Sequence, residues 1–194
     1  MTASLTAKTA ILFFVIIGVI ATSIAFTVWH HDDGDTRVRF RLTSHTGDSV
    51  TQAELRGRHL MVFFGFTSCH SICPTQMSKL TQVMAALDES GHGTRITPVF
   101  ISVDPERDSP EKVAAYLEYF DDRFVGLTGS RSALESAADS FKTILENLPV
   151  ERNGKYQITH SSVVYIVDPL SRIVDYVPGT ADHSEMAEII RDII

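Results

Sequence analysis

The stretch that most constrains this chain is 60–77, LMVFFGFTSCHSICPTQM, where an apolar run leads into the only two cysteines of the sequence. The run from Leu60 to Phe66 is apolar and aromatic, which predicts a buried strand. Pro74 directly follows Cys73 and suits the first turn of a helix, where its missing N–H costs nothing. We therefore expect Cys69 and Cys73 at a turn between a strand and a helix.

Cys69 and Cys73 are four positions apart, so that their sulfurs can converge in such a turn. One metal ion or one disulfide could join them. The N-terminus of a helix carries partial positive charge and unpaired N–H groups, which favour a thiolate and make the sulfur a better ligand and nucleophile. A purely structural disulfide is the alternative. A disulfide across so short a loop restricts the unfolded chain little. Reactivity or metal binding therefore explains the two cysteines better.

An uncharged segment from Thr9 to Trp29 lies near the N-terminus. It is apolar on every side and long enough to cross a hydrocarbon core as a helix. A cleaved signal peptide is the alternative, because residues 23–25, Ser-Ile-Ala, offer small side chains at a suitable cleavage spacing. We favour a retained membrane anchor over residues 1–29, followed by a polar linker over 30–36 and one domain over 37–194.

The expected location of that domain follows from the same segment. Large trailing domains are exported largely regardless of their own charge, and the head before the apolar segment is very short. The first residues lack the Arg- and Ser-rich amphipathic character of an organellar transit peptide. We therefore expect a single span in a bacterial inner membrane, with the soluble domain in the periplasm. The net charge of −7 gives no reason to expect nucleic-acid binding.

The rest of the chain alternates between strand and helix patterns. Strands are predicted over 38–42, 60–66, 96–103, 124–127, 161–168 and 172–177, and helices over 74–89, 110–120, 132–145 and 182–194. Pro169–Ser171 has the length of a hairpin turn, and Asn153-Gly154 marks another turn. A βαβ unit followed by two paired strands and a helix predicts an α/β thioredoxin-like fold, with a central mixed sheet flanked by helices.

Four blocks of sequence, in this order, resemble the SCO/SenC family of copper proteins: FFGFTSCHSICP, FISVDPERDSP, VGLTG and YQITHSSVVYIVDP. The resemblance covers the chain from about Phe40 to Gly179. It implies a thioredoxin-like fold, a copper site made by two cysteines and a distant histidine, and a role in assembling cytochrome c oxidase. The ligands carry over to Cys69, Cys73 and His160. Turn and cap duties explain the aspartates of the second block, which we do not count as ligands.

The donor set that the resemblance implies suits copper as both Cu(I) and Cu(II). Thiolates stabilise Cu(I), and an imidazole accepts Cu(II) as well. Zinc is the alternative metal, because two cysteines and one histidine would leave a fourth position open, as in catalytic zinc sites. The resemblance favours copper. The residue pattern alone does not single out His160 among the eight histidines.

Three functional hypotheses follow. The first is a membrane-tethered copper chaperone, rather than an enzyme, that delivers copper by ligand exchange to the copper-bearing subunit of cytochrome c oxidase. The second is a thiol-disulfide reductase, in which Cys69 and Cys73 keep the oxidase copper-site cysteines reduced through a mixed disulfide. The third is a sensor of redox or copper status. We favour the first, with other periplasmic copper chaperones or thiol-disulfide reductants as further candidate partners.

Overall fold

The computed structural model describes residues 36–143, 145–147, 158–160 and 162–194. The predicted anchor, nearly all of the predicted linker, and the predicted turn at Asn153-Gly154 therefore lie outside the described residues. The segment Thr36–Ile194 forms one compact unit. Within the described ranges, no helix is long and apolar enough to cross a membrane.

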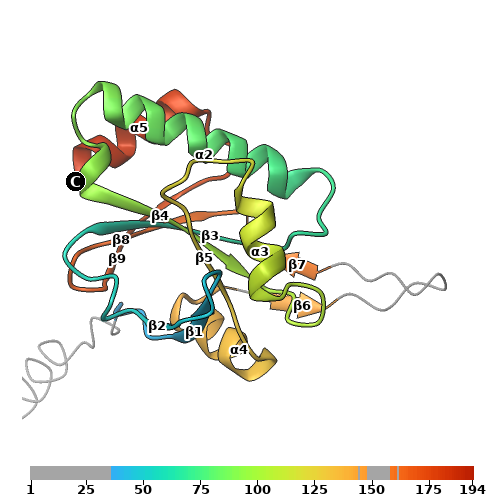
Figure 1. Ribbon diagram of the computed structural model, residues 1–194. Coiled ribbons are helices and arrows are strands. Elements are labelled where there is room, and N and C mark those ends of the chain that lie inside the picture. The colour runs from blue at the N-terminus through green and yellow to red at the C-terminus, as the bar shows by residue number, and fades with distance from the viewer. Residues whose placement is uncertain (1–35, 144, 148–157, 161) are drawn as a thin grey trace, which may run out of the picture. The chain divides into compact units, whose positions relative to one another are not determined.

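A seven-stranded mixed sheet forms the centre of this unit (Figure 1). In spatial order its strands are β2 (Ser49–Thr51), β1 (Arg41–Ser44), β5 (Val125–Thr128), β4 (Ile96–Ser102), β3 (His59–Gly65), β8 (Val164–Val167) and β9 (Ile173–Val177). Strands β3, β4 and β5 run parallel, and the remaining neighbours pair antiparallel. A separate antiparallel pair is formed by β6 (Leu145–Asn147) and β7 (Ile158–His160).

Helices cover both faces of the sheet. Those of the described residues are α2 (Ile72–Glu89), α3 (Pro110–Leu117), α4 (Arg131–Ser140) and α5 (His183–Ile193), with a 3-10 turn over Gly93–Arg95. Figure 1 shows α2 and α5 side by side over one face of the sheet and α4 on the other. The predicted α/β fold, with a central mixed sheet flanked by helices, is confirmed.

Strand β3 is buried on both faces, which explains why its sequence is apolar throughout. On the face that α2 covers, the ring of Phe63 lies 6.4 Å from that of its register partner Phe100. On the other face, the ring of Phe64 lies 5.1 Å from Phe141 and 5.8 Å from Tyr165. Each phenylalanine buried in this way stabilises the fold by about 1.5–3 kcal/mol. The strand that leads to the cysteines is therefore fixed from both sides.

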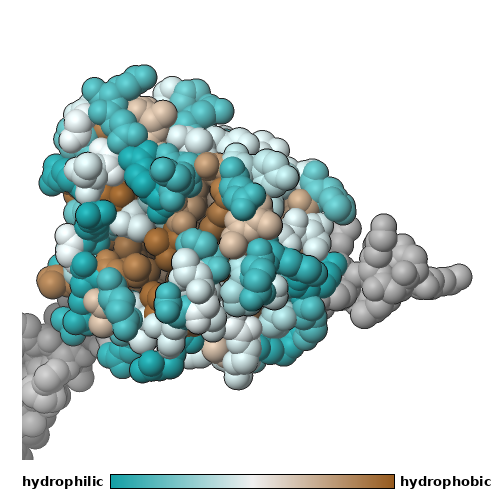
Figure 2. Space-filling view, viewed as in Figure 1, coloured by the Kyte–Doolittle hydropathy of each residue, from teal (hydrophilic) through white to brown (hydrophobic). Residues whose placement is uncertain are grey.

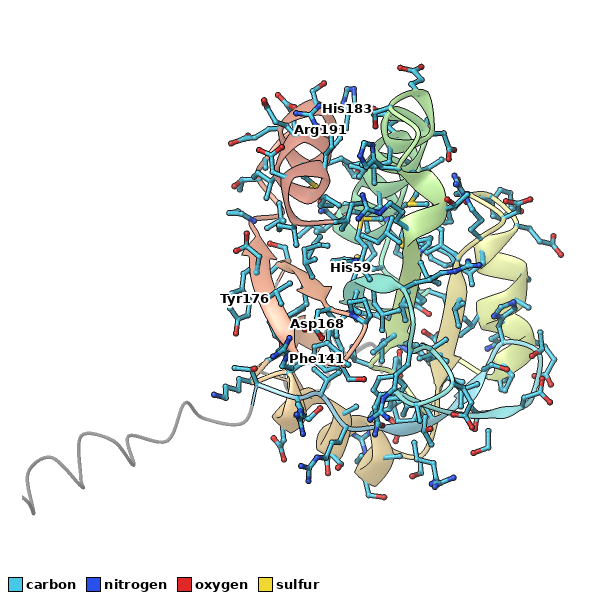
Figure 3. The ribbon with its side chains drawn as sticks, turned by 90° about the vertical axis from the view of Figure 1, so that its left-hand side faces the viewer. His59, Phe141, Asp168, Tyr176, His183 and Arg191 are labelled. Atoms are coloured by element: carbon cyan, nitrogen blue, oxygen red, sulfur yellow. The ribbon has the colours of Figure 1, made fainter. Side chains whose placement is uncertain are left out.

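The predicted hairpin between the last two strands is confirmed. Asp168, labelled in Figure 3, accepts hydrogen bonds of 2.8 Å from the N–H groups of Leu170 and Arg172. Its carboxylate also pairs with the Arg172 guanidinium at 2.6 Å. Ser171 adopts a left-handed conformation with φ of 67°. The side chain of Asp168 thus closes the turn in which Pro169–Ser171 joins β8 to β9.

The helix predicted over 132–145 is shorter than expected. Helix α4 ends at Ser140, and Leu145 already belongs to β6. Between them Lys142 adopts a left-handed conformation with φ of 53°. A left-handed residue after the last turn ends a helix, and the residue most often found there is glycine. Because a lysine and not a glycine stands at this position, the sequence pattern did not indicate that the helix ends here.

Other boundaries differ by a few residues. The strand predicted over 38–42 forms regular pairs only from Arg41, although its apolar side chains point inward as expected. Helix α2 begins at Ile72, two residues before Pro74, and α3 ends at Leu117. Strands β2, β6 and β7 were not predicted, because three residues are too few to show an alternation of apolar and polar side chains.

The surface in Figure 2 is mainly polar over the helices, with an apolar area between the helices and the strands below them. Large apolar side chains exposed in the described residues are Ile72, Tyr119, Leu170, Val174 and Tyr176. Ile72 is notable because it stands next to Cys73 and is 60% exposed. An apolar side chain is therefore presented to solvent beside the candidate site.

Candidate metal centre

The two cysteines lie where β3 passes into α2, as predicted, and both are free thiols. Cys69 lies in the connecting turn, and Cys73 lies in the first turn of the helix. Ser71 occupies the N-cap position, but its side chain makes no capping hydrogen bond. Instead the sulfur of Cys69 accepts a hydrogen bond of 3.4 Å from the backbone N–H of Cys73. The Cys69 sulfur thus takes the place of a capping oxygen.

The environments of the two sulfurs differ. Cys69 is half-buried; burial opposes its ionisation, but hydrogen bonds from the backbone N–H groups of Cys73, Ser71 and Ile72 outweigh it and lower the pKa of the thiol. Cys73 is fully buried, and burial raises its pKa to about 12, with the charges of Cys69 and Asp108 acting in the same direction. The predicted activation by the helix N-terminus therefore applies to Cys69 and not to Cys73.

Gly65, the last residue of β3, leaves room for the Cys73 sulfur. A Cβ atom at this position would lie 3.2 Å from that sulfur and 2.9 Å from the ring of Phe100. Both neighbours belong to the packed core, so neither can withdraw without a cost. This contact explains why an otherwise bulky apolar run ends in a residue without a side chain.

Asp108 ties the turn that carries Cys69 to the neighbouring strand. Its buried carboxylate accepts hydrogen bonds from the backbone N–H and the hydroxyl of Thr67, at 2.8 and 2.6 Å, and from the hydroxyl of Ser102 at 2.6 Å. Its backbone carbonyl accepts a further bond from Thr128. Charge-assisted bonds of this kind are stronger than neutral ones. Asp108 therefore fixes the chain two residues before Cys69.

This role for Asp108 was missed by the sequence analysis, which gave it turn or capping duties. The cap of α3 is Ser109, whose hydroxyl accepts from the N–H of Lys112. Asp108 and Thr67 are 41 positions apart, so no local pattern could indicate their contact. Only the resemblance of the block FISVDPERDSP to the SCO/SenC family pointed to this residue. Parallel pairing of β3 with β4 brings Asp108 and Thr67 together.

A second acidic residue, Asp104, is also buried close to the turn. It forms an ion pair with Arg107, whose guanidinium carbon lies 5.6 Å from the centre of the Phe66 ring. A cation over an aromatic face is attracted by the ring. Arg107 thus covers the end of the apolar run just before the cysteine turn, while its charge is compensated by Asp104.

Tyr116 is the other site residue that sequence reasoning missed, because the helical pattern assigned it only to the core. Its ring lies 5.5 Å from that of Phe100, and its buried hydroxyl has no hydrogen-bond partner among the described residues. Burial raises the pKa of the phenol, and the charges of Cys73, Cys69 and Asp108 raise it further. The phenol of Tyr116 therefore stays neutral, and it lies within range of the charge on the cysteine sulfurs.

His160, the third predicted ligand, is the last residue of β7 and pairs with Leu145 of β6. The structure describes the backbone of this strand. Figure 1 shows the β6–β7 pair beyond the end of the sheet at which β3 passes into α2. The start of β8 lies at the same end of the sheet. Strands β3 and β8 are antiparallel, and Val164, the first residue of β8, pairs with Phe63 near the end of β3. The ligand role of His160 stays a prediction.

The topology divides the other described histidines between the two ends of the sheet. His45 and His59 lie at the end where the parallel strands begin, and His92 follows the last turn of α2 at the same end. His70 lies between the cysteines and is exposed, and His183 opens α5 just after the end of β9. Among these described histidines, His70 and His183 alone therefore compete with the predicted ligand for a place near the sulfurs.

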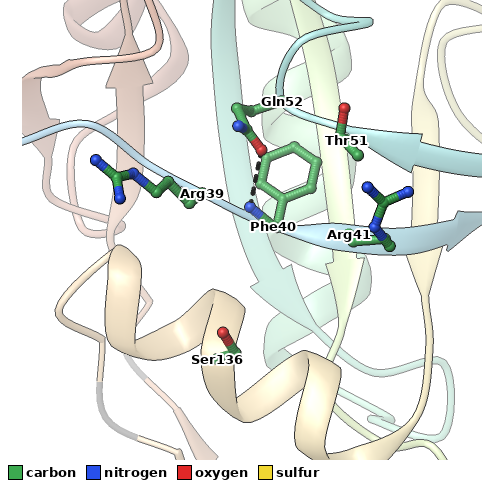
Figure 4. A pocket seen from close by; sticks show the side chains of 6 residues that line it. All are labelled: Arg39, Phe40, Arg41, Thr51, Gln52 and Ser136. Atoms are coloured by element: carbon green, nitrogen blue, oxygen red, sulfur yellow. Dashed lines mark hydrogen bonds between the residues drawn. The ribbon is translucent and has the colours of Figure 1, made fainter.

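Among the residues whose side chains the structure describes, no three Cys, His, Asp or Glu residues gather closely enough to hold a metal ion. The sulfurs of Cys69 and Cys73 nevertheless fit a soft metal ion, since they converge on one turn and leave Cys69 partly accessible. A separate groove, shown in Figure 4, lies between β1, β2 and α4 and contains neither cysteine. It is lined by Arg39, Phe40, Arg41, Thr51, Gln52 and Ser136.

Comparison with known proteins adds to this geometry. Residues 30–194 match the model of the SCO1/SenC family. The chain therefore belongs to the SCO1/SenC family. The mitochondrial SCO2 homolog of Danio rerio is 38% identical to it over 153 residues, which cover 79% of this chain and 55% of the relative. The chain spans about half the length of the vertebrate SCO homologs that it matches.

Solved SCO structures share the fold. ScoI of Arabidopsis thaliana, crystallised with copper bound, superposes with a TM-score of 0.76 at 32% identity, covering 81% of this chain and 98% of that one. BsSco is described as having a disulfide switch and as a member of the Sco family of cytochrome c oxidase assembly proteins. It superposes with a TM-score of 0.65 at 26% identity, covering 80% of this chain and 92% of that one.

Proposed function

We propose that this SCO1/SenC protein is a membrane-tethered copper chaperone, which binds copper through Cys69, Cys73 and His160 and delivers it to cytochrome c oxidase while the oxidase copper site is assembled. The observation that carries the proposal is the convergence of two free thiols at the start of α2. The copper bound to Arabidopsis ScoI and the oxidase-assembly role of BsSco support the metal and the partner.

The roles of the ligands follow from their chemistry. Cysteine binds a metal as thiolate, so both thiols release their protons as copper enters. Cys69 ionises first because the N–H groups of the α2 N-terminus stabilise its thiolate. The positive charge of the metal compensates the cost of ionising the buried Cys73. Two thiolates suffice for Cu(I), and the harder nitrogen of His160 completes the set for Cu(II).

The location proposed for the chaperone is the inner membrane of a bacterium. The uncharged run from Thr9 to Trp29 supports a single retained span, and the export of large trailing domains supports a periplasmic position for the rest. Tethering would hold the copper site at the membrane surface. The copper-bearing subunit of a membrane oxidase is within reach of such a site.

One experiment separates delivery of copper from delivery of electrons. The purified full-length chain is loaded with copper and offered to the copper-bearing domain of the oxidase, either as the reduced apo form or with its cysteines joined in a disulfide. Copper chelation and thiol counting on the separated proteins follow the exchange. Copper moving to the reduced domain supports the chaperone. Reduction of the oxidised domain without any copper movement contradicts it.

A second candidate function, thiol-disulfide reductase, rests on the difference between the two sulfurs. The partly exposed Cys69 thiolate would attack a disulfide of the partner, forming a mixed disulfide and releasing one partner thiolate. Cys73 would then attack the Cys69 sulfur and release the second partner thiolate. The dithiol supplies both electrons and becomes a disulfide. Burial, the main cause of the raised pKa of Cys73, would also oppose its ionisation in the mixed disulfide and slow this second attack, which favours the chaperone.

A further inference from the structure

The structure contains a continuous chain of contacts from the cysteine helix to the segment next to His160. Its first member is Lys79, on α2 six positions after Cys73. The Lys79 ammonium group donates hydrogen bonds of 2.7 Å to the backbone carbonyls of Gly179 and Ala181. These carbonyls belong to the loop between β9 and α5. Lys79 therefore ties this loop to the helix that carries Cys73.

The second member is Gly179, which packs directly against Ser162. A Cβ atom built on Gly179 would fall far inside van der Waals contact with the carbonyl oxygen of Ser162, and 3.0 Å from its Cβ atom. The register explains this approach. Val164 of β8 pairs with Val177 of β9, so two residues beyond the ladder Ser162 faces Gly179. Glycine is required here by the close approach of another backbone.

The third member is the short piece of chain between Ser162 and His160. Two extended residues span at most about 7 Å, so the Cα atom of His160 cannot lie farther than that from the Cα atom of Ser162. The position of Ser162 therefore limits where the backbone of His160 can lie. Lys79, Gly179 and Ser162 together connect the helix that bears one predicted ligand with the strand that bears another.

We propose that Lys79 and Gly179 are positioning residues, which act through Ser162 to hold the His160 segment at the cysteine end of the sheet and so set the affinity for Cu(II). The inference rests on the proposed function, because it takes His160 as a copper ligand. Lys79 and Gly179 make no contact with the metal themselves. They reduce the freedom that His160 would lose when it binds, as residues that orient metal ligands do.

The test compares Lys79→Met and Gly179→Ala with the wild-type full-length chain. Lys79→Met keeps the apolar stem and removes the donors, whereas Gly179→Ala keeps the donors and pushes against Ser162. Both variants should bind Cu(II) about 10–100-fold more weakly, as is usual when a partner that orients a ligand is removed. Both should also change the nitrogen hyperfine pattern of the Cu(II) electron paramagnetic resonance spectrum. Cu(I) affinity and formation of the Cys69–Cys73 disulfide should be unchanged.

Two controls accompany these variants. Lys112→Met removes an exposed lysine of α3 and should leave copper binding as in the wild type. Lys79→Arg keeps a cationic donor and should restore part of the Cu(II) affinity, although its planar group fits two carbonyls less well. Circular dichroism establishes that each variant folds. If Gly179→Ala does not fold, Lys79→Met alone decides the question.

The same measurements in a His160→Ala background separate this inference from the proposed ligand set. Lys79→Met should then have no additional effect on Cu(II) affinity, because the effects of two substitutions that act through the same ligand do not add. Loss of Cu(II) in His160→Ala together with wild-type Cu(II) binding in folded Lys79→Met overturns the positioning role alone. Equal weakening of Cu(I) and Cu(II) by Lys79→Met also overturns it. Unchanged Cu(II) binding in His160→Ala overturns the ligand assignment and, with it, the inference.

Discussion

The backbone N–H of Cys73 donates a hydrogen bond to the sulfur of Cys69 across 3.4 Å. One cysteine thus contributes a main-chain donor to the other, in addition to its own sulfur. This main-chain donor is kept when the side chain at position 73 is replaced by serine, so the helix N-terminus lowers the pKa of Cys69 in addition to the contribution of the second thiol. Selective reactivity of Cys69 is the direct consequence.

The first prediction concerns alkylation of the reduced, metal-free protein by iodoacetamide. The thiolate is the reactive form, so the labelling rate rises as pH passes upward through the pKa of each thiol. Because the pKa of Cys69 is lowered, its labelling rate should reach half of its maximum at a pH below about 8.5, the pKa of a free cysteine. Cys73 should stay unlabelled until the pH approaches about 12. Mass spectrometry of peptides labelled at graded pH measures both rates.

Two controls sharpen this measurement. In Cys73→Ser the backbone N–H is retained, so the pKa of Cys69 should remain below that of a free cysteine. In urea both thiols should label alike, because burial and the helix N-terminus are lost. Equal labelling of the two cysteines in the folded protein would contradict the asymmetry.

The second prediction is that copper and the disulfide exclude one another. Both use the sulfurs of Cys69 and Cys73, and a metal requires them as thiolates. The oxidised protein should therefore lose tight copper binding, and added reductant should restore it. Copper titration of the disulfide and dithiol forms, followed by competition with a chelator, measures the difference. Equal affinities would mean that the cysteines are not the ligands.

The third prediction distinguishes His160 from the cysteines. Cu(I) tolerates two thiolates, whereas Cu(II) gains from a nitrogen donor. His160→Ala should weaken Cu(II) much more than Cu(I), remove the histidine-nitrogen signature from the electron paramagnetic resonance spectrum and leave the disulfide able to form. Cys69→Ser or Cys73→Ser should weaken both oxidation states. A wild-type Cu(II) spectrum in His160→Ala would move the search to His70 and His183, which lie at the same end of the sheet.

The fourth prediction concerns the buried carboxylate of Asp108. In Asp108→Asn one acceptor oxygen becomes a donor that faces the Thr67 and Ser102 donors, so hydrogen bonds are lost. The free energy of unfolding should fall by about 2 kcal/mol, the usual cost of losing bonds to a buried charge. Copper affinity should fall as well, because the turn before Cys69 loosens. Urea unfolding followed by circular dichroism, together with copper titration, measures the two effects.

Ser109→Ala is the matched control for this variant. It removes the cap of α3 next to Asp108 and should cost about 1 kcal/mol, without any contact to the cysteine turn. Stability should therefore fall in both variants and copper affinity only in Asp108→Asn. Copper binding that follows stability equally in both would argue against a specific link between Asp108 and Cys69.

The fifth prediction concerns topology in the membrane. An alkaline phosphatase fusion after Asp35 should be active in a bacterial host, because that enzyme folds only after export. A reporter that works only in the cytoplasm should be silent at the same position. The opposite pattern would place the domain on the cytoplasmic side and exclude periplasmic copper delivery.

The parts of the fold that could be predicted were those with a strong local pattern. The run 60–66 is apolar because β3 is buried on both faces, and the hairpin around Pro169–Ser171 follows from its turn residues. The helix expected over 182–194 has Asp182 as its cap, whose side chain accepts from the N–H of Glu185. Patterns of this kind depend on neighbours in sequence, which a sequence displays directly.

The parts that could not be predicted depend on contacts between distant residues. Asp108 meets Thr67 only because β3 and β4 pair in parallel register, and Tyr116 reaches Phe100 of β4 only once α3 packs on the sheet. The end of α4 depends on a left-handed Lys142, which no local rule anticipates. The cysteines themselves were found because they are the only two of the chain and lie four positions apart, whereas the histidine needed a family resemblance.

The complete burial of Cys73 beside a half-buried Cys69 fixes an order of events at the site. A sulfur or nitrogen atom of another protein can approach Cys69 without disturbing the core, but it cannot approach Cys73. Copper exchanged with a partner would then meet Cys69 first and Cys73 second on capture, and on release Cys73 would let go first and Cys69 last. Capture and release of copper would therefore use the same steps in opposite order, because the core around α2 leaves the site accessible only from the side of Cys69.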